Sequence, residues 1–319
     1  MGGWTRNLNR CVSLGLLLAL LVFTSRSRAA GVVNPCTEAS LNAALVGGGA
    51  VTFACSGTII LTGTKTISSN TSIDATGQSV TINGNNAVRL FIVNGGITAS
   101  FTNLTFTAGS STSGSAISNV GTTTITNSTF SGNSSIGLGG AIYITGVSIT
   151  ITNSTFSGNS SATGGAIYIN AGTVAITNAT FSGNSASNSG GAINRGGGTT
   201  TVRNSILSSA NGGECGGNSG TITDGGYNLS KDASCGFTEI GSVQNVTAEQ
   251  LALGANGGPT QTMLPGNSSI AVDAIPVGDI CGILPVTTDQ RGVARPQHGR
   301  CDIGSVEIPY RVPPRLVSE

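Results

Sequence analysis

One unit repeats along the middle of this chain, between Ile97 and Arg203. In its fullest form it reads Thr-Ile-Thr-Asn-Ser-Thr-Phe-Ser-Gly-Asn, then a short turn rich in serine, threonine and glycine, then Gly-Gly-Ala-Ile-Tyr-Ile. The first asparagine of the unit recurs at nearly constant intervals, at Asn103, Asn127, Asn153, Asn178 and Asn204. Such a repeat predicts a stack of similar units, because one unit cannot bury its apolar face alone.

The residues within each repeat have the pattern of β-strands. From Thr122 to Phe130, and again from Val147 to Phe156, β-branched residues alternate with polar ones between glycine clusters. No part of the repeat has the apolar stripe of a helix, which excludes helical and leucine-rich solenoids. A coil that spans one repeat has room for two or three short strands before the chain returns one strand spacing higher. We therefore predict an all-β, right-handed, single-stranded parallel β-helix, a solenoid of the pectin-lyase type.

Equivalent residues of successive coils should lie directly above one another in such a solenoid. An aromatic column is predicted inside the coils at Phe106, Phe130, Phe156 and Phe181. An aliphatic column is predicted at Ile142, Ile167 and Ile193. Asparagines are predicted to stack at two turn positions, namely at Asn127, Asn153 and Asn178, and at Asn133, Asn159 and Asn184. We interpret all of these columns as core and turn positions rather than ligand sites.

The segment from Met1 to Ala29 has the pattern of an export signal. Arg6 and Arg10 precede an apolar core at 12–23, and a small-x-small cleavage site follows at 27–29. The apolar core is too short for a membrane span. We therefore expect a secreted or cell-surface-associated protein that has no membrane span once the signal is removed.

The rest of the chain carries little charge. Without the signal it has ten basic and thirteen acidic residues, a net charge of about −3, and no basic patch. We therefore expect no nucleic-acid partner. Only 8% of the residues are charged, so the surface must consist largely of serine, threonine, asparagine and glycine. That composition fits a β-solenoid and is unusual for a cytosolic domain.

Six cysteines follow the signal, and they occur as three neighbouring pairs along the chain. The members of each pair are separated by slightly less than one repeat of the central unit. We predict sequential disulfides that join adjacent coils or caps, namely Cys36–Cys55, Cys215–Cys235 and Cys281–Cys301. No pair has the Cys-x-x-Cys spacing of a zinc or redox site, so we expect no metal and no cofactor.

The chain divides into five predicted segments. The signal peptide at 1–29 is followed by an N-terminal cap with the first coils at 30–72. Within the cap, Thr37–Leu45 has the pattern of a short amphipathic helix that would cover the open end of the first coil. The regular coils, a C-terminal module and a tail follow, at 73–213, 214–307 and 308–319.

The central repeats resemble those of a known family. The pattern Phe-Ser-Gly-Asn followed by Gly-Gly-Ala-Ile, at 130–142, 156–167 and 181–193, is similar to the repeats of polymorphic outer-membrane proteins. The resemblance implies a β-helical passenger that acts as a surface adhesin. It covers about a third of the chain, and we do not expect that family's autotransport to carry over.

The C-terminal third resembles a second family over a longer, ordered set of motifs. They are Cys215-Gly-Gly, Gly225-Gly-Tyr-Asn-Leu-Ser230, Asn256-Gly-Gly-Pro-Thr-Gln-Thr262, Thr288-Asp-Gln-Arg-Gly-Val-Ala-Arg-Pro-Gln297 and Cys301-Asp-Ile-Gly304. These motifs are similar to the choice-of-anchor Q module of bacterial secreted β-helix proteins. The resemblance implies a module that follows a β-helix and often precedes an anchoring tail. We expect free secretion here, since no apolar segment follows Glu307.

An enzyme is the main alternative, because many right-handed β-helices cleave polysaccharides. Such sites need paired carboxylates, or carboxylates that hold calcium beside a basic residue. No aspartate or glutamate occurs between Asp74 and Glu214, so the regular coils lack this machinery. An active site would have to use the final module or one of Asp224, Asp232 and Glu239.

The final module has a concentration of charge that the rest of the chain lacks, in Asp289, Arg291, Arg295 and Asp302. We interpret these residues as a structural network around a disulfide rather than a catalytic group. His298, the only histidine, could form a triad with Asp302 and a serine, but no Gly-x-Ser-x-Gly elbow is present. We therefore predict no catalytic residue.

These features favour a secreted β-helix with a structural or adhesive role at the cell surface. Long uncharged faces can hydrogen-bond glycans or pack against another protein, so we expect a surface polysaccharide or surface protein as partner. The alternative is a polysaccharide-cleaving lyase or glycoside hydrolase with its site in the C-terminal third. A third possibility is self-association through exposed strand edges at one end of the solenoid.

Overall fold

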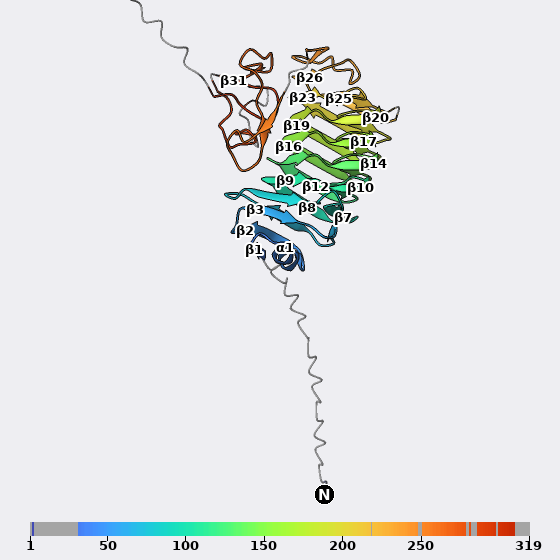
Figure 1. The fold of residues 1–319 in the computed structure, drawn as a ribbon, viewed down its shortest axis with the longest axis vertical. Helices are drawn as coiled ribbons and strands as arrows, with labels where there is room; N and C mark the ends of the chain where they lie inside the picture. Colours follow the sequence, from blue (N-terminus) through green and yellow to red (C-terminus); the bar gives the residue numbers. More distant parts are fainter. Residues whose placement is uncertain are drawn as a thin grey trace, which may run out of the picture.

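The computed structural model describes residues 2, 31–217, 219–247, 251–278, 281, 286–297 and 299–309. Their regular structure is almost entirely β, and α1 (Glu38–Leu45) is the one helix among them. The strands stack as successive parallel coils (Figure 1), so the predicted parallel β-helix is confirmed. The predicted signal peptide, apart from Gly2, lies outside the described residues, as does His298.

The largest sheet has two arms that meet at a corner. We call the first the threonine arm, and its strands are β1 (Gly31–Val33), β2 (Gly49–Phe53), β5 (Thr71–Asp74), β8 (Thr98–Thr102), β12 (Thr122–Thr126), β16 (Ser148–Ser157), β19 (Thr173–Ser182), β22 (Thr199–Arg203) and β25 (Thr221–Asp224). The second is the phenylalanine arm, with β3 (Gly57–Ile60), β6 (Val80–Asn83), β9 (Leu104–Thr107), β13 (Thr129–Ser131), β23 (Ile206–Ser208), β26 (Leu229–Ser230) and β27 (Val243–Gln244). The long strands β16 and β19 run through the corner and belong to both arms.

Two smaller parallel sheets complete the coils. The tyrosine sheet consists of β4 (Lys65–Ile67), β7 (Phe91–Val93), β11 (Ile117–Asn119), β15 (Ile142–Ile144), β18 (Ile167–Ile169), β21 (Ile193–Arg195) and β24 (Cys215–Gly216). The serine sheet consists of β10 (Ser110–Ser113), β14 (Ser134–Leu138), β17 (Ser160–Thr163) and β20 (Ser185–Ser189). Two short antiparallel pairs lie further along the chain, β28 (Leu253–Gly254) with β29 (Thr262–Met263) and β30 (Ile275–Pro276) with β31 (Arg300–Cys301).

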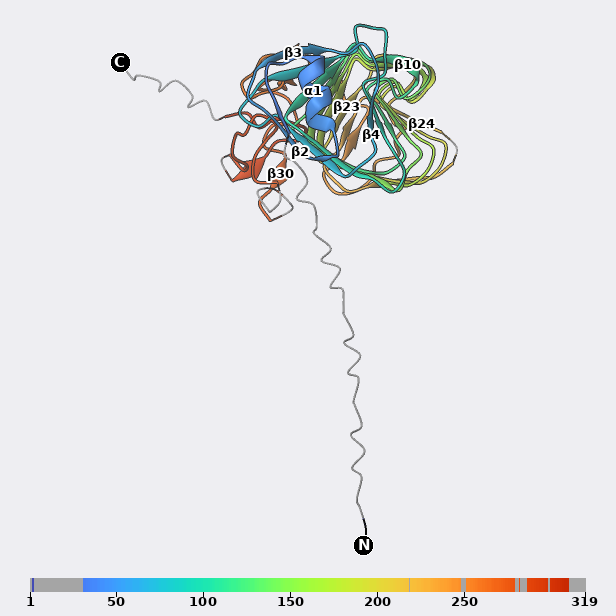
Figure 2. The ribbon, with the colours of Figure 1, turned by 90° about the horizontal axis from the view of Figure 1, so that it is seen from below.

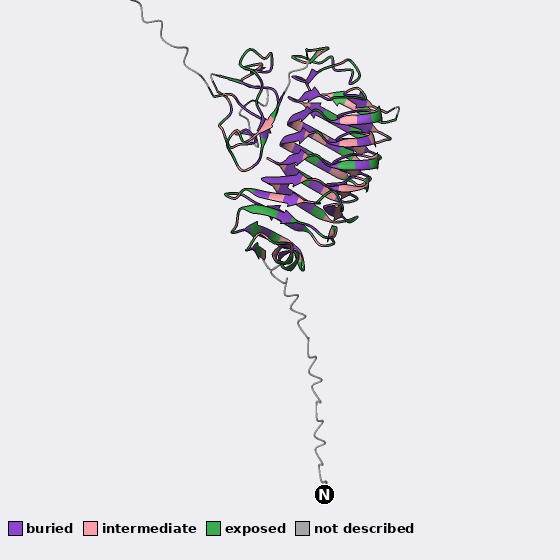
Figure 3. Ribbon diagram, in the orientation of Figure 1, coloured by how far each residue is buried: buried purple, intermediate pink, exposed green. Residues whose placement is uncertain are grey.

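Columns of identical side chains fill the inside of the coils. Four phenylalanine rings stack nearly parallel at centroid distances of 4.6, 4.8 and 4.6 Å, namely Phe106, Phe130, Phe156 and Phe181. Three fully buried isoleucines are register partners in the tyrosine sheet, namely Ile142, Ile167 and Ile193. These positions are the ones expected from the repeat, and Figure 3 shows that buried residues continue up the whole stack. Their burial is the main source of stability in each coil.

Asn133, Asn159 and Asn184 form a buried amide ladder between the phenylalanine arm and the serine sheet. Nδ2 of Asn133 donates to Oδ1 of Asn159 at 3.0 Å, and Nδ2 of Asn159 donates to Oδ1 of Asn184 at 2.9 Å. Each amide also donates to a phenylalanine carbonyl of the preceding coil. The ladder thus satisfies polar atoms that would destabilise the core if they were left unpaired.

The other asparagine column forms the corner between the two arms. Its members have a left-handed backbone, with φ between 48° and 58°, at Asn103, Asn127, Asn153, Asn178 and Asn204. Asparagine tolerates this conformation better than most residues that carry a Cβ. Within the described residues these side chains bond to one another at a single step, from Nδ2 of Asn178 to Oδ1 of Asn153 at 3.2 Å. The column is therefore a series of turns more than a continuous ladder.

Helix α1 caps the first coil. It lies across the open end of the solenoid (Figure 2), with Leu41 and Ala44 buried beneath it. The hydroxyl of Thr37 accepts a hydrogen bond from the Ser40 amide at 3.3 Å, which fixes the start of the helix. No helix in the described part of the chain is long and apolar enough to cross a bilayer.

Three disulfides hold the caps and the C-terminal segment, and they are the pairs that the spacing predicts. Cys36–Cys55 joins the chain before α1 to the turn after β2, with 5.7 Å between Cα atoms. Cys215–Cys235 joins the last coils. Cys281–Cys301 lies in the segment that follows them.

The chain after residue 213 has two structural parts. Strands β24 to β27 stack in parallel on the earlier coils, so the solenoid continues to Gln244. The described residues from 251 to 309 instead fold back and lie beside the phenylalanine arm, where they are coloured orange to red in Figure 1. We call them the docked segment. The expected module at 214–307 therefore includes the last coils of the solenoid as well as the docked segment.

Candidate functional site

Two tyrosines form an outward-facing pair on the tyrosine sheet. Tyr143 and Tyr168 are register partners at the centres of β15 and β18, and the buried isoleucines on either side of each tyrosine direct it away from the core. Their rings lie 5.9 Å apart between centroids with an angle of 29° between planes, and both residues are half-buried. A Cβ at Gly196 would overlap the hydroxyl of Tyr168, so this glycine leaves room for the ring. The pair is an aromatic platform on a rigid sheet.

Arg195, which ends β21 of this sheet, and Arg89, which precedes β7, are both tied to turns. Arg89 donates to the carbonyls of Gly114 at 3.1 Å and Ser113 at 2.7 Å. Arg195 donates to three glycine carbonyls of the last coil, between 3.1 and 3.2 Å. Burial lowers the pKa of both guanidinium groups. Their hydrogen bonds therefore stabilise the turns, and the platform between them is neutral.

Asp224, one of the carboxylates considered for an enzyme, organises its own loop. Oδ1 accepts from Gly226 N, Asn228 Nδ2 and the Ser242 hydroxyl, and Oδ2 accepts from Thr238 N and Glu239 N. Burial by itself would raise the pKa of Asp224, but these hydrogen bonds outweigh burial and lower it. The carboxylate is thus held ionised as the centre of the loop.

Asp232, the second such carboxylate, has a similar role. Oδ1 accepts from the amide of Ser234 at 2.9 Å and from its hydroxyl, and Oδ2 accepts from Glu214 N at 3.1 Å. These contacts fix the turn that leads to Cys235. Both oxygens are occupied by the protein's own donors. Glu239, the third carboxylate named for the alternative, is exposed at the surface of the Asp224 loop.

Glu214 is a buried acid that the sequence analysis did not single out. Its carbonyl accepts from the amides of Ala192 and Ile193, so Gly212-Gly213-Glu214-Cys215 takes the place of Gly-Gly-Ala-Ile in the last coil. Oε1 accepts from Ser209 N at 2.6 Å, while Oε2 has no hydrogen-bond partner. Burial, with a smaller contribution from Asp232, raises the pKa of Glu214 to about 7. Extending the repeat by one more coil would have revealed this substitution of an alanine by an acid.

Most of the charged residues of the docked segment form one buried network. Asp289 and Arg291 form an ion pair at 2.7 Å, and Asp289 also accepts from Glu307 N at 2.8 Å. Arg295 forms an ion pair with Glu307 at 3.1 Å and donates to the carbonyl of Asp302 at 2.7 Å. All of these side chains are buried or nearly so. Their donors and acceptors hold the loops of this segment together, as a structural network would.

Gln290 connects this network to the solenoid. Its Nε2 donates to the hydroxyls of Thr129 at 2.8 Å and Thr260 at 2.9 Å, and its Oε1 accepts from Thr155 at 2.7 Å. One coil further, Thr180 accepts from Ser305 N at 3.0 Å. The outward threonines of the phenylalanine arm are thus the docking positions for the segment.

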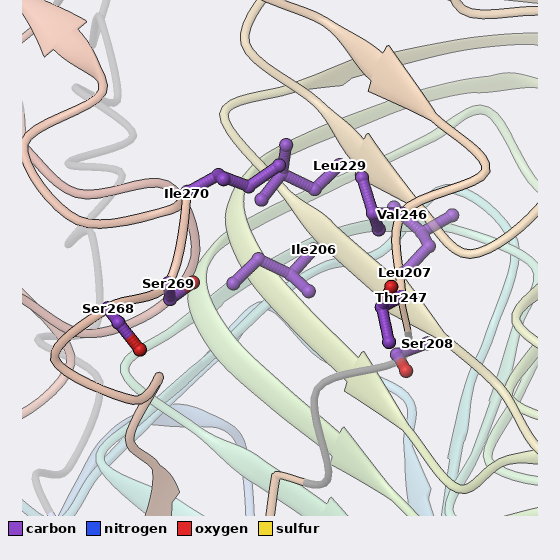
Figure 4. Close-up of a pocket in the computed structure, with 9 residues that line it drawn as sticks. All are labelled: Ile206, Leu207, Ser208, Leu229, Val246, Thr247, Ser268, Ser269 and Ile270. Atoms are coloured by element: carbon purple, nitrogen blue, oxygen red, sulfur yellow. The ribbon is translucent and has the colours of Figure 1, made fainter.

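A cavity of about 310 Å³ lies where the docked segment leaves this arm (Figure 4). It is lined by Ile206, Leu207, Ser208, Leu229, Val246, Thr247, Ser268, Ser269 and Ile270. No acid, base or thiol is among these lining residues, and its polar side chains are hydroxyls.

The described surfaces therefore offer aromatic, hydroxyl and amide groups rather than a cluster of reactive ones. No three histidine, cysteine, aspartate or glutamate side chains within the described residues are grouped so as to hold a metal ion. Comparison of the chain with protein-family models, curated proteins and solved structures gives no match.

Proposed function

We propose that this chain is a secreted β-helix with a structural or adhesive role at the cell surface, and that it binds polysaccharide through the tyrosine sheet. The observation that carries the proposal is the outward pair of Tyr143 and Tyr168 at the centre of a rigid sheet. Tyrosine has a flat apolar body and a polar tip, which makes it common at interfaces that are partly wet.

The pair is suited to sugar rings for three reasons. A sugar ring has an apolar face of C–H groups that can cover an aromatic ring, and its hydroxyls need polar partners at the edge. Ser118 occupies the same outward column one coil before the pair, where it is half-buried and offers a hydroxyl. The sheet beneath is fixed by buried isoleucines, so little conformational freedom is lost on binding.

Export is supported by two features. The segment at 1–29 has the pattern of a signal peptide. The three disulfides are typical of proteins that fold in an oxidising compartment.

Polysaccharide cleavage is the competing proposal. It predicts that cleavage is lost when Asp224 or Asp232 is changed to asparagine. Against it, both carboxylates accept several hydrogen bonds from their own loops. One plate of immobilised polymers can score both retained protein and newly released reducing or unsaturated ends.

The test uses purified protein on immobilised pectin, alginate, xylan, chitin and peptidoglycan. We expect retention on at least one polymer, and at least tenfold weaker retention for Tyr143→Ala combined with Tyr168→Ala, which corresponds to about 1.4 kcal/mol. Ile136→Ala is the matched control, because Ile136 is an 82% exposed apolar residue on the serine sheet. Tyr143→Phe with Tyr168→Phe should retain most of the binding.

Two outcomes would contradict adhesion through this sheet. One is equal retention of the wild type and the double alanine variant. The other is release of new chain ends that disappears in Asp224→Asn or Asp232→Asn, which would establish the enzyme instead.

A further inference from the structure

The outer side of the threonine arm carries a regular array of hydroxyl groups. Two columns of outward residues cross β8, β12, β16, β19, β22 and β25, a third crosses the first four of these strands, and the register is continuous with no bulge. The first column is Thr98, Thr122, Ser148, Thr173, Thr199 and Thr221. The second is Ser100, Thr124, Thr150, Ala175, Thr201 and Thr223. The third is Thr102, Thr126, Thr152 and Thr177.

The side chains of this array are held in fixed directions. From β8 to β22 every second residue of the arm is buried, as with Ile149 and Ile151 in β16, so the outward residues cannot turn inward. Threonine is β-branched and stiff at χ1, which fixes its methyl and hydroxyl relative to the sheet. Among the described residues, Thr199 to Thr173 at 3.4 Å is the single hydrogen bond that these outward hydroxyls make. The other hydroxyls of the array are exposed or half-buried, with the third column half-buried throughout, and they can bond a ligand.

The array repeats in two directions with nearly constant spacings. Neighbouring coils are separated by about 4.8 Å, and alternate residues along a strand by about 6.6 Å. No charged residue belongs to the three columns, and Asp74 and Arg203 mark the two ends of the third. A hollow of about 270 Å³ borders the array at Thr98 and Ser100, but the strands beyond it form an open face that suits neither a small molecule nor an ion. The complement of such a face is an extended, uncharged lattice of hydrogen-bonding groups.

Ice is such a lattice. The oxygen atoms on the prism faces of hexagonal ice repeat at distances close to both spacings of the array. Water between the threonine methyl groups is already restricted in orientation, and the fixed hydroxyls can bond it in the positions that the lattice requires. Each contact is weak, but many are made at once because the scaffold is rigid.

We infer that the threonine arm binds the surface of growing ice crystals and limits their growth. This activity goes beyond polysaccharide adhesion and belongs to a different sheet. An ordered polysaccharide is the less suitable occupant, because the array contains no aromatic side chain on which a sugar ring could stack. A bulky side chain at the centre of the array would keep the ice surface from contacting the surrounding threonines.

The experiment measures ice shaping, thermal hysteresis and inhibition of recrystallisation with the purified full chain, beside serum albumin at equal concentration. Thr124 and Thr150 are exposed register partners in the central column. We expect Thr124→Lys combined with Thr150→Lys to reduce the activity at least tenfold. Thr112→Lys is the matched control, because Thr112 is an exposed threonine on the serine sheet, and it should keep full activity. Circular dichroism and thermal unfolding establish that the variants are folded.

Three results would overturn the inference. They are a wild-type chain no more active than albumin, a double lysine variant as active as the wild type, and wild-type binding to crystalline cellulose with none to ice. The variant Tyr143→Ala with Tyr168→Ala should retain full ice activity. Failure of polysaccharide binding and failure of ice binding are thus observed separately.

Discussion

At the scale of single residues, Glu214 is the least expected feature of the core. Earlier coils have alanine at this position, namely Ala116, Ala141, Ala166 and Ala192. Glu214 is 1% exposed and one of its oxygens has no partner. The neutral acid is therefore the form that the folded protein prefers, and burial raises the pKa of Glu214 to about 7.

This shift predicts a loss of stability as the pH rises. Below about pH 4.5 Glu214 is protonated in both the folded and the unfolded chain, so it has no effect on the free energy of unfolding. Between about pH 4.5 and 7 the unfolded chain ionises first, and the folded state loses about 3 kcal/mol relative to it. Urea unfolding of the oxidised protein across this range should show the loss in the wild type, relative to Glu214→Gln.

The control is Glu239→Gln, because Glu239 is exposed. Its pH dependence should follow that of the wild type. An unchanged difference between wild type and Glu214→Gln at pH 4.5 and pH 8 would show that the carboxyl finds a partner when it ionises.

The stacked residues could be predicted from the sequence, whereas Glu214 and the tyrosine platform were missed. Phe156 and Ile167 were predictable because each coil repeats the same sequence unit, so the period alone assigns their columns. In the last coil Glu214 replaces the alanine of that unit. The Ile-Tyr-Ile pattern of β15 and β18 already signalled the outward Tyr143 and Tyr168, since alternate residues of a strand point to opposite faces.

At the scale of elements, the docked segment is the part that the sequence could not place. Its contacts with the coils join residues far apart in the chain, such as Gln290 with Thr129 across 161 positions. The sequence of the segment has no period or alternation from which these contacts could be predicted. In the sequence, the outward threonines of the phenylalanine arm have the same pattern as those of the threonine arm. In the structure, the docked segment buries the former, whereas the latter are exposed or half-buried.

Gln290→Ala should loosen this docking without unfolding the coils. Gln290 is fully buried and bonded to both sides of the interface, so its loss leaves buried hydroxyls with fewer partners. Removal of such bonds costs about 1–3 kcal/mol, which raises local opening by about fivefold to 150-fold. Hydrogen exchange should therefore become faster in 286–309 and stay unchanged in β12 to β19.

Gln261→Ala is the matched control, because Gln261 is exposed and contacts Thr129 through its backbone carbonyl. Its exchange pattern should equal that of the wild type. Faster exchange throughout the solenoid in Gln290→Ala would mean that the segment and the coils unfold as one unit.

At the scale of the whole molecule, the solenoid is a one-dimensional stack. Each coil contacts the coils before and after it, so the ends have one neighbour and the middle has two. Disulfides occur at both ends, Cys36–Cys55 beside α1 and Cys215–Cys235 in the last coils. They strengthen the places where fraying begins.

Reduction of the disulfides should therefore act on the ends. Each disulfide contributes about 2–4 kcal/mol to stability. In the reduced protein, hydrogen exchange should accelerate in β1, β2 and α1, in β24 to β27, and in the docked segment that Cys281–Cys301 joins, while β12 to β19 remain the slowest. The variant Cys36→Ser with Cys55→Ser should accelerate exchange at the N-terminal end alone. A uniform acceleration along the stack would show that the coils open together.

The parallel connectivity also suits folding in the order of the sequence. Each coil is completed by residues that directly follow those of the coil below, so coils can assemble one after another as the chain is delivered, N-terminus first, to the compartment where it folds. The surface that receives Gln290 is formed by Thr129 and Thr155, which precede Gln290 by more than a hundred residues. We therefore expect the docked segment to bind last, on coils that are already folded.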